Sequence, residues 1–151
     1  MTVVKMEEKH IDQVYEIETS SFSIPWGKED ILKEVRENKH AVYYAAVEDE
    51  TVAGYGGMWH VINEGHITNV AVREDARRMG VGGMILDALE GYANENGLIG
   101  LTLEVRISNE AAQRLYTKHG FKPEGFRKNY YADTGEDAVI MWKRLAPSAR
   151  D

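Results

Sequence analysis

The chain has 151 residues, of which 43% are hydrophobic and 28% charged, and its formal net charge is −7. Its length predicts one domain over residues 1–151, and the lack of cysteine excludes disulfides and cysteine-based nucleophiles or metal sites, which fits the cytoplasm. The acidic balance argues against direct nucleic-acid binding, and it is compatible either with a cationic substrate or with a need for solubility alone.

The first half of the chain alternates between helical and strand patterns. Apolar residues recur at helical spacing in two segments, and three shorter strand-like segments follow. The predicted helices lie near Lys9–Ser20 and Lys28–Asn38, and the predicted strands near Ala41–Val47, Val52–Trp59 and Gly65–Val72. Gly54, Gly56 and Gly57 fall inside the second strand, where they indicate a bulge or a close packing contact more than a phosphate site.

A loop rich in glycine and arginine, Arg77-Arg78-Met79-Gly80-Val81-Gly82, follows the third strand. A strongly periodic helix is predicted behind it, over residues 81–96, with Gly97 placed to end it. The first N–H groups of a helix lack partners within the helix, and arginine adds donors suited to phosphate, so we expect this loop to bind a pyrophosphate. A P-loop requires Lys-Ser or Lys-Thr after its glycines, and neither follows here. A dinucleotide fingerprint requires a third glycine, but Ile85 stands at that position, so neither phosphate-binding motif fits.

The second half of the chain is predicted to form a strand over residues 98–105, a helix over residues 109–119 and a last strand near Ala138–Leu145. Alternation within the first of these strands puts Leu101, Leu103 and Val105 on one face and Thr102 and Glu104 on the other. Ser108 and Asn109 are N-cap candidates for the helix, and Gly120 is placed to end it. Mixed strands and helices of this kind predict an α/β sheet with helices on both faces.

Four strings of residues, taken together, resemble a known family. They are R-x-x-G-x-G at Arg77–Gly82, L-E-V-R-x-S-N at Leu103–Asn109 with Leu115-Tyr116 and Gly120-Phe121 behind it, R-x-N-Y-Y at Arg127–Tyr131, and E-D-A-x-x-M at Glu136–Met141. The first is similar to the acetyl-CoA loop of the GCN5-related N-acetyltransferases (GNAT). With Pro25-Trp26, the others resemble the RimI family of that superfamily, over roughly Val3 to Leu145.

The resemblance implies a fold and an activity. The expected fold is the GNAT fold, an α/β structure with a mixed, mostly antiparallel sheet of about seven strands, splayed central parallel strands and about four flanking helices. RimI enzymes transfer acetyl from acetyl-CoA to the N-terminal alanine of the eighteenth protein of the small ribosomal subunit. The expected partner is therefore a ribosomal protein N-terminus, with no direct nucleic acid and no membrane, and the expected state is a monomer or weak dimer.

The resemblance also implies roles for individual residues. Glu104 matches the general base, which is thought to act through water, and Tyr116 matches the acid that protonates the departing thiolate. Judged from spacing alone, a surface carboxylate is the more usual interpretation of Glu104, and Tyr116 is compatible with a core tyrosine. The implied cofactor contacts are the backbone at Val70, Ala71 and Val72, the loop residues Arg77, Arg78, Met79, Gly80, Val81 and Gly82, and Asn109. The implied borders of the peptide cleft are Trp26, Tyr130 and Tyr131.

Two positions in the glycine loop depart from the enterobacterial pattern. Arg77 stands where glutamine is common, and Met79 stands where a basic residue is common. Neither change removes the backbone cradle, but Met79 takes away one positive charge, which leaves the cofactor affinity open.

Two further functions stay open beside N-terminal acetylation. One is a GNAT acetyltransferase acting on protein lysines or a small amine, and the other is a non-catalytic acyl-CoA-binding regulatory module. Glu104 and Tyr116 argue against the module, because binding alone needs neither side chain. The five histidines form no metal-binding pattern, so no metal is expected. We expect neither a signal peptide nor a membrane span, and we expect residues 147–151 to be frayed.

Overall fold

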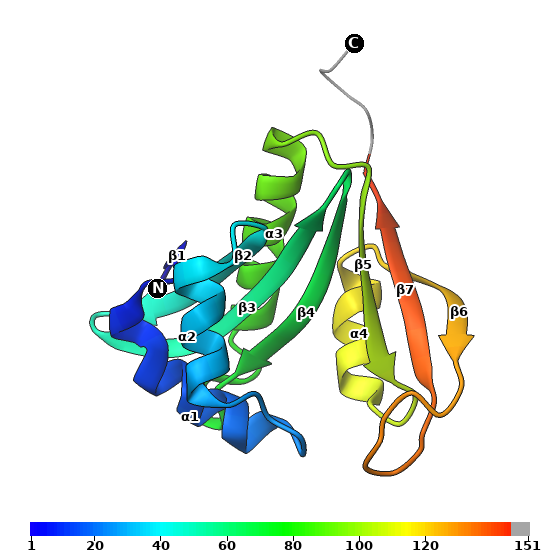
Figure 1. Ribbon diagram of the computed structural model, residues 1–151, viewed down its shortest axis with the longest axis horizontal. Helices are drawn as coiled ribbons and strands as arrows, with labels where there is room; N and C mark the ends of the chain where they lie inside the picture. Colours follow the sequence, from blue (N-terminus) through cyan, green and yellow to red (C-terminus); the bar gives the residue numbers. More distant parts are fainter. Residues whose placement is uncertain (146–151) are drawn as a thin grey trace.

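Residues 1–145 are described by the structure, a computed structural model, in which seven strands form one sheet (Figure 1). The strands are β1 (Thr2–Lys5), β2 (Ala41–Glu48), β3 (Thr51–Val61), β4 (Glu64–Val72), β5 (Gly100–Arg106), β6 (Lys122–Arg127) and β7 (Ala138–Arg144). Their spatial order is β1-β2-β3-β4-β5-β7-β6, and every neighbouring pair is antiparallel except β4 and β5. The predicted mixed, mostly antiparallel sheet is confirmed. The expectation that residues 147–151 are frayed concerns residues outside the described range.

Four α-helices flank this sheet, as expected. They are α1 (Ile11–Ser21), α2 (Lys28–Glu37), α3 (Val81–Glu95) and α4 (Glu110–Lys118), with two short 3-10 helices, η1 (Glu8–His10) and η2 (Glu74–Ala76). The first two lie on one face of the sheet, and α3 lies on the other (Figure 1). Each face has its own apolar core, and α4 shares the core of α3. Among the described residues, no helix is both long and apolar enough to cross a membrane.

The sequence patterns missed two strands, β1 and β6. Strand β1 has only four residues, too few for a periodic pattern to show. Strand β6 contains Pro123 and Gly125, residue types that are depleted in strands, and the register with β7 shifts between them. Because β6 lies at the edge of the sheet, it tolerates a proline that a central strand would not.

The two parallel strands at the centre of the sheet pair over only three residues. Residues 64–66 of β4 face residues 100–102 of β5, and beyond His66 the strands part (Figure 1). Gly57 faces Asn69 across β3 and β4 while Met58 faces Ile67, so Thr68 is an extra residue that bulges β4 at this point. The predicted splayed parallel strands are therefore present, with a bulge beside the parting.

Glycines in β3 let helix α3 pack directly on the strand backbone. A Cβ atom at Gly54 would lie 2.9 Å from Val81 Cγ1, and one at Gly56 would lie 2.5 Å from Ile85 Cγ2. The predicted close packing is therefore confirmed at Gly54 and Gly56, and β3 also bulges beside Gly54, where Ala53 has no partner in β2. The contact matters for the site because Val81 belongs to the glycine loop and is the first residue of α3.

Candidate active site

The glycine loop joins the end of β4 to the start of α3. Gly80 is the N-cap of the helix at φ 79°, a left-handed conformation that glycine adopts without strain, and no side chain of the described residues caps this end. Arg78 also has a positive φ, 70°. The first N–H groups of α3 therefore face outward beside two arginines, an arrangement suited to binding an anion.

Gly82, the last residue of the loop motif, also has a packing role. A Cβ atom there would lie 3.1 Å from Leu115 Cδ2 on α4, so the absence of a side chain lets α3 and α4 approach closely. Asn109 caps α4, since its Oδ1 accepts a hydrogen bond from the Ala112 N–H at 3.1 Å. The N-cap prediction for Asn109 is confirmed. The capping bond uses the side-chain oxygen, so the side-chain nitrogen takes no part in it.

Glu104 lies where the parallel strands part. Its Oε1 accepts a hydrogen bond from His66 Nε2 at 2.9 Å, and its Oε2 accepts one from Arg127 Nε at 3.3 Å. The Glu104 side chain is only 10% exposed. The bond from His66 lowers the pKa of Glu104, with Arg127 adding to the effect and partial burial opposing it. The same bond raises the pKa of His66 above its usual 6.5.

Tyr116 lies in the core formed under α3 and α4. Its ring meets that of Phe121 edge to face, with centroids 5.7 Å apart. Burial raises the pKa of the Tyr116 hydroxyl well above its usual range, and the neighbouring Tyr131 raises it further. Tyr116 therefore keeps its proton at any physiological pH, which fits a proton donor or a core tyrosine.

The two candidate catalytic residues lie on opposite faces of the sheet. Leu101, Leu103 and Val105 share the core that contains Tyr116, so the alternation of β5 turns Glu104 to the other face. Beyond His66 and Thr102 the strands β4 and β5 no longer pair, so their facing backbone groups there are available to a ligand.

The three predicted substrate contacts lie in two segments, one between α1 and α2 and the other between β6 and β7. Tyr130 and Tyr131 form an edge-to-face pair, 5.1 Å between centroids, in the segment after β6. Trp26 lies in the segment between α1 and α2, and its ring centroid is 6.5 Å from that of Trp59. Trp59 on β3 is paired with His66 on β4. A chain of neighbouring side chains thus connects Trp26 to the Glu104 site.

His66, Arg127 and Arg106 also contact the predicted site residues, and none of the three was predicted from the sequence. His66 and Glu104 are 38 positions apart, so no local spacing connects them. Arg127 and Arg106 stand inside the strings that carried the family resemblance, which was the available signal for both.

A buried carboxylate, Glu18, was missed as well. It accepts hydrogen bonds from the Trp26 N–H at 2.8 Å, from Asn69 Nδ2 at 3.2 Å and from the Tyr55 hydroxyl. Burial, with Glu18 as its negatively charged neighbour, raises the pKa of Tyr55. This group attaches α1 and the Trp26 segment to the bulged part of β4. The sequence held a signal for it, because Glu18 falls on the apolar stripe of its helix, next to Val14 and Ile17.

Known proteins resemble this chain over nearly its whole length. The acetyltransferase (GNAT) family matches residues 11–121. A Bacillus subtilis (strain 168) protein, provisionally named a [ribosomal protein bS18]-alanine N-acetyltransferase, is 44% identical over 140 residues, 93% of each chain. The crystal structure of the ribosomal-protein-S18-alanine N-acetyltransferase from Escherichia coli superposes with a TM-score of 0.86 at 29% identity, covering 98% of this chain and 97% of that one. Ard1 from Thermoplasma volcanium gives a TM-score of 0.85 at 31% identity, covering 96% and 97%. The chain therefore belongs to the acetyltransferase (GNAT) family and, as its sequence strings predicted, is a RimI-like N-acetyltransferase.

Proposed function

We propose that this enzyme transfers the acetyl group of acetyl-CoA to the α-amine of an N-terminal alanine on a small-subunit ribosomal protein. An Escherichia coli relative, 30% identical over 142 residues, is named for this activity on bS18. The observation that carries the proposal is the Glu104–His66 pair at the point where β4 and β5 part. That pair supplies a proton acceptor beside the point where the two strands part.

The residues around the point where β4 and β5 part fit an acyl-CoA. The uncapped start of α3 with Arg77 and Arg78 suits a pyrophosphate, and the loop glycines give its backbone room to approach one. Beyond His66, the backbone of β4 at Val70, Ala71 and Val72 has no strand partner on its β5 side, so it can pair with the amides of a pantetheine arm. Asn109 is placed to add a side-chain contact from the start of α4. Acetyl-CoA, when bound, supplies an activated thioester.

The reaction needs no covalent enzyme intermediate. The neutral amine attacks the thioester carbonyl carbon, the carbon–sulfur bond breaks, and the products are an acetylated amine and the thiol of coenzyme A. Glu104, linked by water, accepts the proton that the amine loses, and Tyr116 donates a proton to the departing sulfur. Both groups start in the required state, since Glu104 has a lowered pKa and is ionised, while Tyr116 has a raised pKa and is protonated.

The choice of an α-amine over lysine follows from the strength of this base. At pH 7 an α-amine, with a pKa of about 7.7–8.0, reaches its neutral form for about 1 kcal/mol, whereas lysine, near 10.4, needs about 4–5 kcal/mol. The hydrogen bond from His66 lowers the pKa of Glu104 and so makes it a weaker base. A weak base is adequate for an amine that is already partly neutral, and it favours the N-terminus over a lysine side chain.

A peptide that offers both amines tests the proposal. It would begin with a free alanine followed by arginine and aromatic residues, and it would carry one internal lysine. After incubation with acetyl-CoA, mass-spectrometric fragmentation would locate the acetyl group, and the same peptide with a blocked N-terminus would be the control. Acetyl on the alanine is expected. Acetyl on lysine alone would favour a lysine acetyltransferase, and bound acetyl-CoA without turnover on any amine would favour a binding module.

A further inference from the structure

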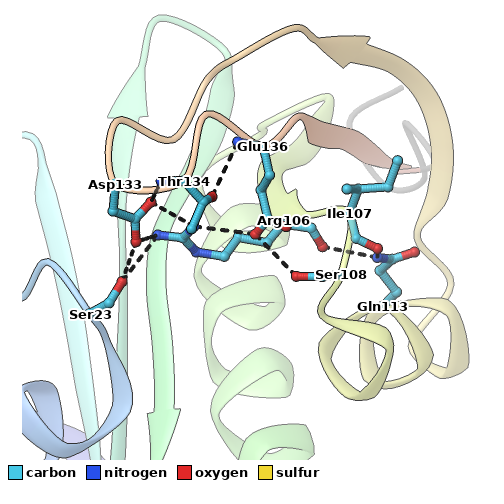
Figure 2. A network of polar contacts seen from close by, with 8 residues as sticks. All are labelled: Ser23, Arg106, Ile107, Ser108, Gln113, Asp133, Thr134 and Glu136. Carbon is cyan, nitrogen blue, oxygen red and sulfur yellow. Dashed lines mark hydrogen bonds and ion pairs between the residues drawn. The ribbon is translucent and has the colours of Figure 1, made fainter.

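Arg106 lies two residues after Glu104 on the same face of β5, at the end of the strand. Its guanidinium donates to both carboxylate oxygens of Asp133, from Nη1 at 2.9 Å and from Nη2 at 2.8 Å. Nη1 also donates to Glu136 Oε1 at 3.2 Å, and Nη2 donates to Ser23 Oγ at 3.3 Å. Figure 2 shows Arg106 reaching between the segment that carries Ser23 and the segment that carries Asp133.

These contacts join two segments that are far apart in the sequence. Ser23 lies between α1 and α2, in the same connection as Trp26, and Asp133 lies between β6 and β7, in the same connection as Tyr131. The Ser23 hydroxyl donates directly to Asp133 Oδ2 at 2.5 Å, across 110 positions of the chain. We call Ser23, Arg106, Asp133 and Glu136 the clasp, because together they hold the two segments against the end of β5.

The clasp also holds the Tyr131 ring. The Arg106 guanidinium lies over this ring, 4.0 Å from its centroid. The backbone around Tyr131 is closed by two hydrogen bonds, from the Tyr131 N–H to the Glu136 carbonyl at 3.2 Å and from the Gly135 N–H to the Tyr131 carbonyl at 2.7 Å. Burial raises the pKa of Tyr131 to about 12, with nearby Glu104 adding to the rise. Arg106 thus orients the Tyr131 ring, and the charge of Glu104 acts on the Tyr131 hydroxyl.

The chemistry of the clasp favours one fixed geometry. The Arg106 and Asp133 side chains are 25% and 22% exposed, so the pair is largely shielded from solvent. A planar guanidinium that binds a carboxylate through two parallel bonds and stacks on a ring sets angles as well as distances, which a lysine ammonium cannot do. The two segments carry the predicted substrate contacts Trp26 and Tyr131, so fixing the segments fixes where these two side chains lie relative to each other.

We propose that Arg106 is a positioning residue for the acceptor peptide: through the clasp it holds Tyr131 and the segment between α1 and α2 as two walls of the acceptor cleft. This inference rests on the proposed N-terminal acetylation. It assigns Arg106 no contact with acetyl-CoA and no proton transfer. Losing the clasp should therefore weaken binding of the peptide while leaving cofactor binding and chemistry nearly unchanged.

Arg106→Lys tests this inference, because it keeps the charge but loses the paired bonds and the stacking. The peptide KM should rise about tenfold, with kcat at saturating peptide within about threefold of wild type and the KM for acetyl-CoA unchanged. The matched control is Arg144→Lys. Arg144 also pairs with a carboxylate, Glu124 at 2.6 Å, and also lies over a ring, that of Trp142 at 4.1 Å, but at the opposite end of β5. Its peptide KM should match wild type.

If Arg106→Lys does not fold, the variants Asp133→Asn and Ser23→Ala test the inference instead. Asp133→Asn removes the charge of the paired carboxylate, and Ser23→Ala removes only the direct contact between the two segments. A peptide KM that rises in both supports the inference. A folded Arg106→Lys enzyme with an unchanged peptide KM would overturn the inference. So would a folded enzyme in which only kcat falls or only the KM for acetyl-CoA rises. A wild-type enzyme that fails to acetylate the peptide overturns the proposed function itself, which separates the two failures.

Discussion

His66, the last residue of β4 that pairs with β5, forms a hydrogen bond of 2.9 Å with Glu104, two residues beyond its paired partner Thr102. One strand contributes an imidazole and the other a carboxylate, at the point where the sheet opens. Arg127 reaches the second oxygen of the same carboxylate at 3.3 Å. The proposed base is therefore held in place from both sides before any substrate arrives, and its two partners keep it ionised.

Glu104→Gln should lower kcat by about a hundredfold, the usual range for loss of a positioned base. The loss should be largest at low pH, where more of the amine is protonated and the reaction depends most on proton removal. The measurement is kcat against pH with saturating peptide. Glu124→Gln, which removes the charge of an exposed carboxylate paired with Arg144, is the control and should match wild type. An equal loss in both variants would argue against the role of Glu104.

The pKa of His66 should depend on Glu104. We expect an NMR titration to place it above 6.5 in the wild type and to show it falling in Glu104→Gln, because the carboxylate is the main cause of the rise. Glu124→Gln should leave it unchanged, and a titration that is the same in all three proteins would contradict the ion pair.

The same pair predicts how stability depends on pH. A raised His66 pKa stabilises the fold below about pH 6.5, and this contribution is lost as the pH rises through the folded-state value. A lowered Glu104 pKa stabilises the fold above about pH 4.5, and this contribution is lost as the pH falls through the folded-state value. The difference in melting temperature between the wild type and Glu104→Gln should therefore be greatest between these limits.

Tyr116→Phe should lower kcat by about ten- to a hundredfold through loss of the proton donor. The phenyl ring can keep the edge-to-face contact with Phe121, so the melting temperature should change little. Tyr92→Phe is the control, because it removes a hydroxyl whose hydrogen bond within residues 1–145 is to His60, at 2.9 Å, and not to Glu104 or Tyr116. Normal kcat in a folded Tyr116→Phe enzyme would remove Tyr116 as the acid.

Gly54→Ala should destabilise the fold by about 1–3 kcal/mol, because the new Cβ would lie 2.9 Å from both the Ala71 carbonyl oxygen and Val81 Cγ1. Relief of that overlap moves the start of α3, so binding of coenzyme A, measured by calorimetry, should weaken too. Gly91→Ala, in helix α3 itself, is the control. Nothing lies within 4 Å of its new Cβ, and it should stabilise the fold by about 0.5–1 kcal/mol. If Gly54→Ala were as stable as wild type, close packing would not explain this glycine.

Local patterns in the sequence were enough to locate most of the fold. The apolar stripes of α1 to α4, the alternation of β5 and the stops at Gly97 and Gly120 all depend on near neighbours in the chain, and both glycines do take positive φ beyond their helices. The anion-binding loop could be identified for the same reason, since strand, glycines and helix follow one another directly. Strands β1 and β6 were not predicted, because β1 is short and β6 contains proline and glycine.

The contacts of the site depend on which strands become neighbours and in what register. His66 and Glu104 meet across 38 positions, and Arg106 meets Ser23 across 83, distances over which no hydrophobic period carries information. The family resemblance named Glu104 and Tyr116, but it gave no account of what holds them. Pairing of β4 with β5 over three residues, followed by the bulge at Thr68, brings these side chains together, because a strand register sets which residues face each other only once the sheet has formed.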